Sequence, residues 1–346
     1  MNRSKPFIRE ASQEELTAWL NRRGYPGWRA KQIRRWLYKE WIADFSAMSN
    51  LPREMRRDLA DSFSGESVEC RKTEVSRDST RKFLFQLSDA ELVETVLMPT
   101  EKRLTVCVST QAGCPVGCRF CATGRNGFRR NLEVAEIIDQ VLYCCRYMNR
   151  KITNLVVMGM GEPLLNFDST VKALRLLNDA ELLDLSARGV TVSTSGIPEG
   201  IRKLAEMKAQ WNLAWSLHSP DEQCRSRLIP DHHRYSIQEI SDACLYYRLL
   251  TGRRVTIEYT LMAGCNDSRE DAERVARLAA EIKAKVNLIG YNPAAPDYRR
   301  SLESSSLSFL KRLRRLGVTA TVRRGRGQDI QAACGQLRGG YQNQPD

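Results

Sequence analysis

From residue 104 onward, short apolar runs alternate with longer segments that carry apolar residues at helical spacing. Six such strand–helix units, with a seventh strand after them, predict an α/β fold in which helices cover a parallel sheet. The predicted strands are Leu104 to Ser109, Ile152 to Met158, Val190 to Thr194, Leu213 to Leu217, Val255 to Leu261, Val286 to Ile289 and Val318 to Arg323. The predicted helices include Val134 to Tyr147, Ser169 to Leu177, Ile237 to Leu249, Arg269 to Lys283 and Leu307 to Leu316. In full or partial parallel barrels the functional groups gather in the loops that follow the strands.

All six loops after these strands carry glycine or polar residues. They are GCPVGCRFCATG at 113–124, GMGEP at 159–163, STSG at 193–196, SLHSP at 216–220, MAGCND at 262–267 and YNP at 291–293. Glycine lets the backbone approach a ligand closely, while polar side chains on one rim can orient it. Taken alone, GMGEP would suit an ordinary turn. Six such loops on one face predict a common binding site, whose candidate polar groups are Glu162, Ser193, Ser216, His218 and Asn292.

The first loop contains three cysteines, Cys114, Cys118 and Cys121, at the spacing Cys-x3-Cys-x2-Cys. Three thiolates interleaved with glycines can surround one soft metal centre. Zinc is one candidate, but a structural zinc site takes four ligands, and no second cysteine or histidine pair follows at finger spacing. A 4Fe-4S cluster on three cysteines suits the spacing better, because one iron stays free to bind a reactant. The loop is therefore predicted to be catalytic.

The net charge of +13 over 346 residues indicates a polyanionic partner. Between Arg299 and Arg326, nine Lys or Arg stand against one acid, Glu303, and this distribution favours contacts with phosphates. Eleven cysteines, three of them in one loop, do not have the pattern of a secreted disulfide scaffold. The charged N-terminus lacks the apolar core of a signal peptide, and no apolar run reaches the roughly 18 residues of a membrane span. We expect a cytoplasmic protein without membrane contact.

Two segments precede the core, which is predicted to span residues 100–340. Residues 1–65 are predicted to form a basic helical module that binds RNA, with helices at Glu14 to Leu20, Ala30 to Trp41 and Pro52 to Phe63. Its aromatic residues are predicted to lie mainly in the core: Trp28, Trp36 and Tyr38. Its candidates for phosphate contacts are Arg22, Arg23, Arg29, Lys31, Arg34 and Arg35.

Residues 66–99 are predicted to form a hairpin linker with its turn around Ser88 to Ala90. This linker carries Glu94 between apolar residues, where a carboxylate is costly unless it has a partner or a task. The sequence context alone does not decide between a partner and a task.

The cysteine spacing is the motif of radical S-adenosylmethionine (SAM) enzymes, and other stretches resemble one family among them. These stretches are ETV at 94, CVSTQAGC at 107, MGMGEPLLN at 158, SLHSP at 216, EYTLMAG at 258, YNP at 291 and GQDIQAACGQL at 327. Together they resemble the RlmN and Cfr family of RNA adenine methyltransferases, from about Trp28 to Leu337. The resemblance implies a partial (β/α)6 barrel with one 4Fe-4S cluster, whose open iron binds SAM. It also implies a SAM pocket that contains Gly161, Glu162, Ser193, Ser216, Leu217, His218 and Asn292.

The same resemblance implies roles for two further cysteines and for Glu94. Carbons 2 and 8 of adenine are electron-poor, so a radical route replaces ordinary methyl transfer. In the family's route one SAM methylates a cysteine that matches Cys334, and a second SAM yields a radical that takes hydrogen from that methyl group. Glu94 matches the base that removes the ring proton, and Cys107 matches the cysteine that releases the product by forming a transient disulfide with Cys334. By itself, Cys107 would be interpreted as a buried small hydrophobe.

We therefore predict an iron–sulfur, SAM-dependent RNA methyltransferase that acts on adenine carbon 2 in 23S rRNA, with tRNA as a further candidate. It would use two SAM molecules per turnover, take electrons from an unidentified donor and act as a monomer. Methylation of carbon 8 by the same residues is the alternative. A non-catalytic zinc RNA-binding protein and a radical SAM enzyme acting on protein are more distant ones, and the second would leave Cys107, Cys334 and Glu94 without joint roles.

Two details of the sequence fall outside this pattern. Asp231, His232 and His233 follow Pro230, where the family has Ile-Asn and a basic residue, and this departure bears on the choice of RNA target. Six further cysteines match no motif position and are expected to be structural: Cys70, Cys144, Cys145, Cys224, Cys244 and Cys265.

Overall fold

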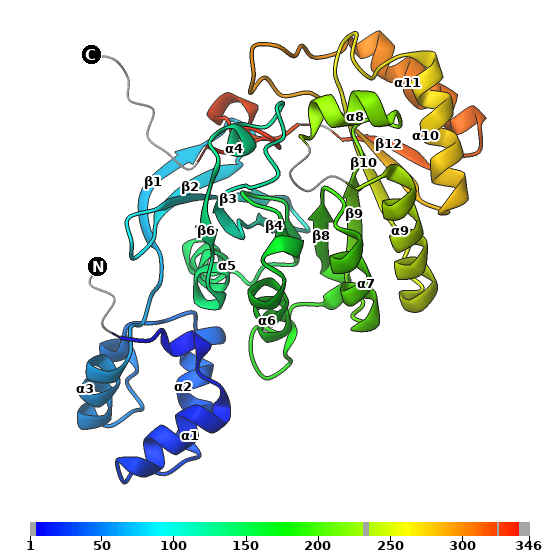
Figure 1. Cartoon of the computed structure of the whole chain (residues 1–346). Coiled ribbons are helices and arrows are strands. Elements are labelled where there is room, and N and C mark those ends of the chain that lie inside the picture. The colour runs from blue at the N-terminus through cyan, green and yellow to red at the C-terminus, as the bar shows by residue number, and fades with distance from the viewer. Residues whose placement is uncertain (1–4, 231–234, 324, 339–346) are drawn as a thin grey trace, which may run out of the picture.

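The core of the chain is one curved sheet, to which the described residues contribute ten strands in the order β1-β2-β3-β4-β7-β8-β9-β10-β11-β12 (Figure 1). The computed structural model describes residues 5–230, 235–323 and 325–338. Neighbouring strands from β4 to β12 are parallel. These strands are β4 (Leu104–Cys107), β7 (Asn154–Val157), β8 (Val190–Thr194), β9 (Asn212–Ser216), β10 (Thr256–Leu261), β11 (Lys285–Gly290) and β12 (Ala320–Arg323). The predicted fold class is confirmed, and every predicted strand forms with small shifts at its ends.

Helices cover the outer face of the parallel strands (Figure 1). They are α5 (Val134–Met148), α6 (Phe167–Asn178), α7 (Pro198–Glu206), α9 (Ile237–Thr251), α10 (Arg269–Glu281) and α11 (Glu303–Arg315). Local sequence signals set their ends: Ser236 and Glu239 form a reciprocal capping box before α9, and Gly252 takes a φ of +69° after it. Helix α7 and the short α8 (Glu222–Leu228) have no counterpart in the sequence prediction. None of the helices formed by the described residues is long and apolar enough to cross a bilayer.

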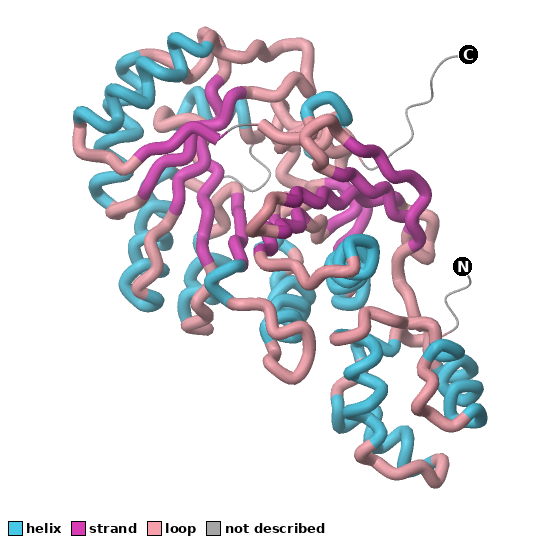
Figure 2. Tube along the Cα trace, turned by 180° about the vertical axis from the view of Figure 1, so that it is seen from behind, coloured by secondary structure: helices cyan, strands magenta, loops and turns pink. Residues whose placement is uncertain are grey.

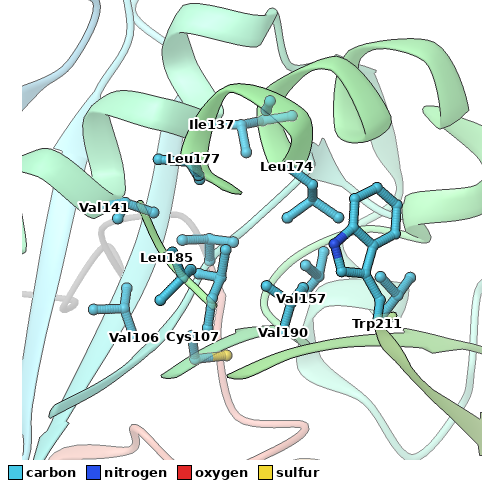
Figure 3. Close-up of a cluster of buried hydrophobic side chains, with 14 of the residues drawn as sticks. Val106, Cys107, Ile137, Val141, Val157, Leu174, Leu177, Leu185, Val190 and Trp211 are labelled. Carbon is cyan, nitrogen blue, oxygen red and sulfur yellow. The ribbon is translucent and has the colours of Figure 1, made fainter. Parts of the chain in front are cut away.

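A hydrophobic layer joins the sheet to α5 and α6 (Figure 3). Ile137 and Val141 of α5 and Leu177 of α6 are fully buried in it. Burial of each such side chain contributes roughly 1.5–3 kcal/mol. Figure 3 also shows that the sulfur of Cys107 points away from Ile137 and Val141.

Three antiparallel strands extend the sheet beyond β4 (Figure 2). They are β1 (Glu69–Val75), β2 (Arg81–Gln86) and β3 (Leu92–Pro99). Strands β2 and β3 form the hairpin predicted around Ser88 to Ala90, whereas β1 has no predicted counterpart. Because β3 pairs with β4, residues 69–99 continue the core sheet.

The N-terminal module contains α1 (Gln13–Arg22), α2 (Arg29–Tyr38) and α3 (Arg53–Ser62), and it lies beside one end of the barrel (Figure 1). A buried ion pair joins it to the core, because Arg9 donates to the carboxylate of Asp139 on α5. Ser67 donates to the same carboxylate from its amide at 2.7 Å and from its hydroxyl at 2.5 Å. The three residues thus lock the end of the module to α5.

The aromatic residues of this module do not all lie in its core. Tyr38 is buried and Trp36 is half-buried, as predicted, but Trp28 is 58% exposed. The Arg29 guanidinium lies 4.5 Å from the Trp28 ring centroid, in a cation–π arrangement. The core prediction for Trp28 is therefore wrong. Trp28 precedes α2 rather than lying within it, so helical packing does not turn its ring inward.

Candidate active site

A cavity of about 170 Å³ lies at the carboxyl ends of the parallel strands. The loops after β5, β7, β8 and β9 all contribute to its wall, and the chain segment after β12 closes one side. The predicted site residues that line it are Cys114, Cys118, Cys121, Gly161, Glu162, Ser193, Ser216, His218 and Cys334. The predicted residues outside its lining are Glu94, Cys107, Leu217 and Asn292.

The cysteine loop starts from a small hairpin that the sequence did not predict. Strand β5 (Gln111–Gly113) pairs with β6 (Phe128–Asn131), and the loop and the short α4 (Ala122–Arg125) lie between them. Gly113 has a φ of +76°, and a Cβ there would meet the carbonyl oxygen of Gly127 at 1.9 Å. A side chain on Gly124 would likewise meet the backbone of Cys118. These glycines let the loop fold tightly enough to turn its three thiols into one cavity.

The three thiols suit an iron–sulfur cluster by their chemistry. Burial raises the pKa of the Cys114 thiol to about 12, and it also raises the pKa values of Cys118 and Cys121. Binding to iron therefore has to displace three protons, which couples cluster loading to pH. In the described parts of the chain, no group of three or more His, Cys, Asp or Glu side chains is arranged to hold a single metal ion. A cubane offers each cysteine its own iron, so its thiolates need not converge on one point.

Glu162 follows β7 and is held by backbone and hydroxyl donors. Its Oε2 accepts from the Ser195 amide at 2.7 Å and from the Ser195 hydroxyl at 2.9 Å, while its Oε1 accepts from the Leu164 amide at 3.1 Å. Burial raises the pKa of this carboxyl group, and the donors oppose that effect. Gly161 has a φ of +103°, and a Cβ there would meet Gln111 at 2.6 Å. The GMGEP turn thus presents a rigid carboxylate at the cavity wall.

His218 follows β9 and is a neutral member of the cavity wall. Burial lowers the pKa of its imidazole to about 3, and the charge of Arg225 lowers it further. Its Nδ1 accepts a hydrogen bond from the Thr260 amide at 3.1 Å, so the remaining proton is assigned to Nε2. Phe120 of the cysteine loop packs edge-on against the ring, with centroids 4.8 Å apart. His218 can therefore offer one N–H donor to a bound ligand without carrying charge.

Ser193 and Ser216 lie on neighbouring strands, with their hydroxyl oxygens 3.5 Å apart. Both line the cavity. Leu217 is fully buried, and its amide donates to the Glu258 carbonyl at 3.1 Å. Its side chain thus packs in the core, while the two hydroxyls face the site.

The C-terminal segment brings Cys334 to the cysteine loop. The Ala122 amide donates to the Gly335 carbonyl at 2.8 Å, and the Thr123 hydroxyl donates to the Leu337 carbonyl at 2.6 Å. The side-chain amide of Asn292 donates to the Cys334 carbonyl at 3.2 Å. Asn292 therefore holds the Cys334 loop in this structure and does not line the main cavity.

A second, smaller cavity lies next to the first and contains Cys107. Its lining includes Val96, Cys107, Asn292, Arg323 and Cys334, of which Arg323 and Cys334 also line the main cavity. Burial raises the pKa of the Cys107 thiol to about 12, the nearby Cys334 raises it further, and Arg323 opposes both effects. Cys334 thus borders both the cavity with the three cysteines and the cavity with Cys107.

Glu94 has a partner that the sequence did not reveal. Its Oε1 lies 3.1 Å from the ammonium of Lys82 on β2, and its Oε2 accepts from the Arg338 amide at 2.5 Å. Lys82 in turn lies 3.1 Å from Glu74 on β1. Lys82 and Glu94 are both buried, whereas the Glu74 side chain is 30% exposed. A line of alternating charges therefore runs from buried Glu94 across the strands to the surface.

Two charged residues of the main cavity escaped the sequence prediction. Glu258 on β10 is buried, and its carboxylate accepts from the Asn287 side-chain amide at 2.8 Å. Arg323 on β12 was assigned to the basic stretch from Arg299 to Arg326, yet it lines both cavities. The neighbouring Cys334 and, with a smaller effect, Glu258 raise the pKa of Arg323. Burial along β12 does not alternate from residue to residue, so the sequence pattern of this strand alone carries no clear signal for it.

The other basic residues between Arg299 and Arg326 also differ in their surroundings: some have partners within the protein, and others are exposed. Arg312 pairs with Glu273 on α10, and Arg326 donates to the Pro99 carbonyl at 3.1 Å. Lys311 and Arg315 are exposed on α11 and stay available for phosphates. The departure at Asp231, His232 and His233 lies outside the described residues.

Comparisons with known proteins identify the family of the chain. Residues 108–279 match the family model of the radical SAM superfamily. Residues 8–64 match the model of the ribosomal RNA large subunit methyltransferase N-terminal domain.

The similarity extends over almost the whole chain. A protein of Thermosynechococcus vestitus named "Probable dual-specificity RNA methyltransferase RlmN" is 45% identical over 328 residues, which are 94% of this chain and 96% of the relative. A relative of the same name from Thermus thermophilus is 46% identical over 316 residues, 90% of this chain and 89% of the relative. The crystal structure of a radical SAM methyltransferase from Sphaerobacter thermophilus has a TM-score of 0.93 at 43% identity, and the match covers 97% of this chain and 100% of that chain. The chain belongs to the radical SAM superfamily and, within it, to the RlmN family of RNA methyltransferases.

Proposed function

We propose that this enzyme methylates carbon 2 of an adenosine in 23S rRNA, and of an adenosine in tRNA, through an S-methylcysteine at Cys334. The observation that carries the proposal is that Cys334 borders both cavities, one with the three cysteines and one with Cys107. A sulfur in that place can react with a group bound in the main cavity and with Cys107 in the smaller cavity. The term "dual-specificity" in the relatives' names supports two classes of RNA substrate.

The three cysteines of the loop would hold one 4Fe-4S cluster, and SAM would bind between Gly161, Glu162 and His218. When bound, the cluster and SAM supply one-electron chemistry that generates a carbon radical. Two SAM molecules are used per turnover, one as the source of the methyl group and one for the radical. The neutral His218 and the fixed Glu162 orient polar groups of the ligand.

The protein's own residues carry the rest of the reaction. The Cys334 sulfur holds the one-carbon unit while it bonds to the adenine ring. The adduct then loses one electron, which replaces the electron consumed in cleaving SAM, and the Glu94 carboxylate takes the ring proton. The Cys107 thiolate attacks the Cys334 sulfur and forms a Cys107–Cys334 disulfide, while the transferred carbon leaves with the electron pair of its bond to sulfur and takes up a proton to become the methyl group. Cytosolic thiol reductants return the disulfide to two thiols. The raised pKa of Cys107 disfavours its thiolate form. The positive charge of Arg323, which lines the same cavity as both cysteines, lowers this pKa and so favours the attack.

The partners follow from the same chemistry. The enzyme would take electrons from a donor protein, act as a monomer in a reducing cytoplasm and meet RNA through exposed basic residues such as Lys31 and Arg35 of the module. All eleven cysteines are free in the structure, which supports a reducing compartment.

Mass spectrometry of rRNA and tRNA from cells with and without this protein tests the proposal. We expect a methyl group on adenine carbon 2 that disappears with the gene and with a Cys334→Ala variant. A methyl group on carbon 8 would assign the alternative reaction to the same residues. Normal methylation by the Cys334→Ala variant would contradict the proposed route.

A further inference from the structure

Two cysteines outside the proposed chemistry lie in contact. Cys224 lies on α8, and Cys265 lies in the turn after β10. Their sulfur atoms are 3.9 Å apart, and the Cys224 thiol also lies 3.6 Å from the Cys265 carbonyl oxygen. Both side chains are half-buried, so a small reagent can reach them from solvent. This arrangement is a vicinal dithiol built from segments that are distant in sequence.

The dithiol packs against the inner wall of the active site. A small apolar cluster joins it to the cysteine loop, which itself contributes two members of the cluster; the members are Val116, Phe120, Leu228, Ile229, Met262 and Tyr291. Cys224 and Cys265 pack against one part of this cluster, while the three cysteines of the loop pack against it as well. Close-packed side chains therefore connect the dithiol to the cysteine loop.

Helix α8 connects the dithiol to the main cavity by a second route. The carbonyl of Leu228, at the end of α8, accepts a hydrogen bond of 3.0 Å from the Arg119 amide in the cysteine loop. The next residue, Ile229, lines the main cavity. Arg225 on the same helix donates to the Ser195 carbonyl at 2.6 Å. The position of α8 thus sets part of the cavity wall.

We propose that Cys224 and Cys265 form a reversible disulfide that fastens α8 to the turn after β10. A disulfide bond is about 2.05 Å long, so the two sulfurs have to approach by about 2 Å. The reduced and oxidised forms then differ in how firmly α8 is held.

The oxidant in this reaction is glutathione disulfide, a low-molecular-weight disulfide. One thiolate of the pair attacks it, forms a mixed disulfide and releases one glutathione thiolate. The second thiolate attacks the protein sulfur of that mixed disulfide and releases the second glutathione. The two cysteines lose two protons and two electrons, and the oxidant becomes two molecules of glutathione.

Peptide mass spectrometry of the full-length, cluster-loaded protein tests the proposal. The protein is equilibrated without oxygen at a series of ratios of reduced to oxidised glutathione, and its free thiols are then blocked. We expect a linked peptide pair that joins Cys224 to Cys265, about 2 Da lighter than the two reduced peptides together, and expect its loss when reduced glutathione is in excess. Free thiols at every ratio, or glutathione on either cysteine without a linked pair, would overturn the proposal.

Hydrogen exchange provides the second readout, because it follows the backbone and does not depend on RNA methylation. We expect slower exchange of residues 222–229 in the oxidised protein than in the reduced one. Cys265→Ser should abolish this difference. Cys70→Ser is the matched control, since Cys70 is also half-buried but lies on β1, at the opposite end of the sheet order from β10 and β11. Equal exchange in both redox states, or a slowing that survives in Cys265→Ser, would contradict the tether.

Discussion

Cys107 and Cys334 line one cavity, although Cys107 lies on the first parallel strand and Cys334 follows the last. The curvature of the sheet brings the two ends of the barrel together, and the hydrogen bond from Asn292 to the Cys334 carbonyl holds the second sulfur in place. Asn292→Ala should therefore lower the rate of RNA methylation more than it lowers SAM affinity. Single-turnover methylation and equilibrium SAM binding, measured on the same cluster-loaded protein, check this split. A loss confined to SAM affinity would assign Asn292 to the SAM pocket instead.

Lys82 is expected to hold the Glu94 carboxylate in position. Lys82→Met removes the ammonium that lies 3.1 Å from this carboxylate, so the buried side chain loses one of the contacts that fix it. We expect the rate of RNA methylation to fall by about tenfold or more, with little change in SAM affinity. Lys72→Met is the control, because Lys72 also contacts Glu74 but is exposed. An unchanged methylation rate in Lys82→Met would refute the role.

His218 should make the folded protein less stable in mild acid. Its folded-state pKa of about 3 lies below the ordinary value, so the unfolded chain binds the proton first. The contribution of neutral His218 to the free energy of unfolding is complete above about pH 6.5. Below that pH it falls by about 1.4 kcal/mol for each pH unit, until the folded-state pKa is reached. Urea unfolding between pH 7 and pH 5 should show a smaller loss of stability in His218→Gln than in the unsubstituted protein. Parallel curves for the two proteins would show that His218 is not buried in its neutral form.

The buried pair of Arg9 and Asp139 should control how firmly the N-terminal module is attached. Arg9→Met leaves the Asp139 carboxylate with Ser67 as its remaining partner, at a cost of about 3–5 kcal/mol. Limited proteolysis should then cut near residue 65 much faster than in the unsubstituted protein. Asp139→Asn with Arg9→Met should restore part of the resistance, because no buried charge remains. Equal proteolysis rates in all three proteins would contradict this attachment.

Much of this architecture follows from short-range patterns in the sequence. The alternation of apolar strands and helices and the spacing of Cys114, Cys118 and Cys121 are local, so both could be predicted. The partner of Glu94 could not, because Lys82 lies on the neighbouring strand and only the register of the hairpin brings the two together. Arg323 looked like part of a basic surface because a count of charges ignores the direction in which a strand residue points.

Metal analysis distinguishes the cluster from zinc. Protein purified without oxygen should contain about four irons and four sulfides per chain, and Cys118→Ala should lose most of them. Cys70→Ser is a suitable control, because that cysteine lies on β1, outside the loop. One zinc per chain, without iron, would contradict the proposed cluster.

In the proposed route, Cys334 carries the transferred carbon and Cys107 releases it. The most direct measurement is mass spectrometry of the Cys107→Ala variant after turnover with SAM and an RNA substrate, followed by digestion of protein and RNA. The account predicts a peptide in which the Cys334 sulfur is joined to adenosine through one carbon atom, and it predicts no such species in the Cys334→Ala variant. Methylated RNA released by Cys107→Ala without this adduct, or an adduct on another residue, would contradict it.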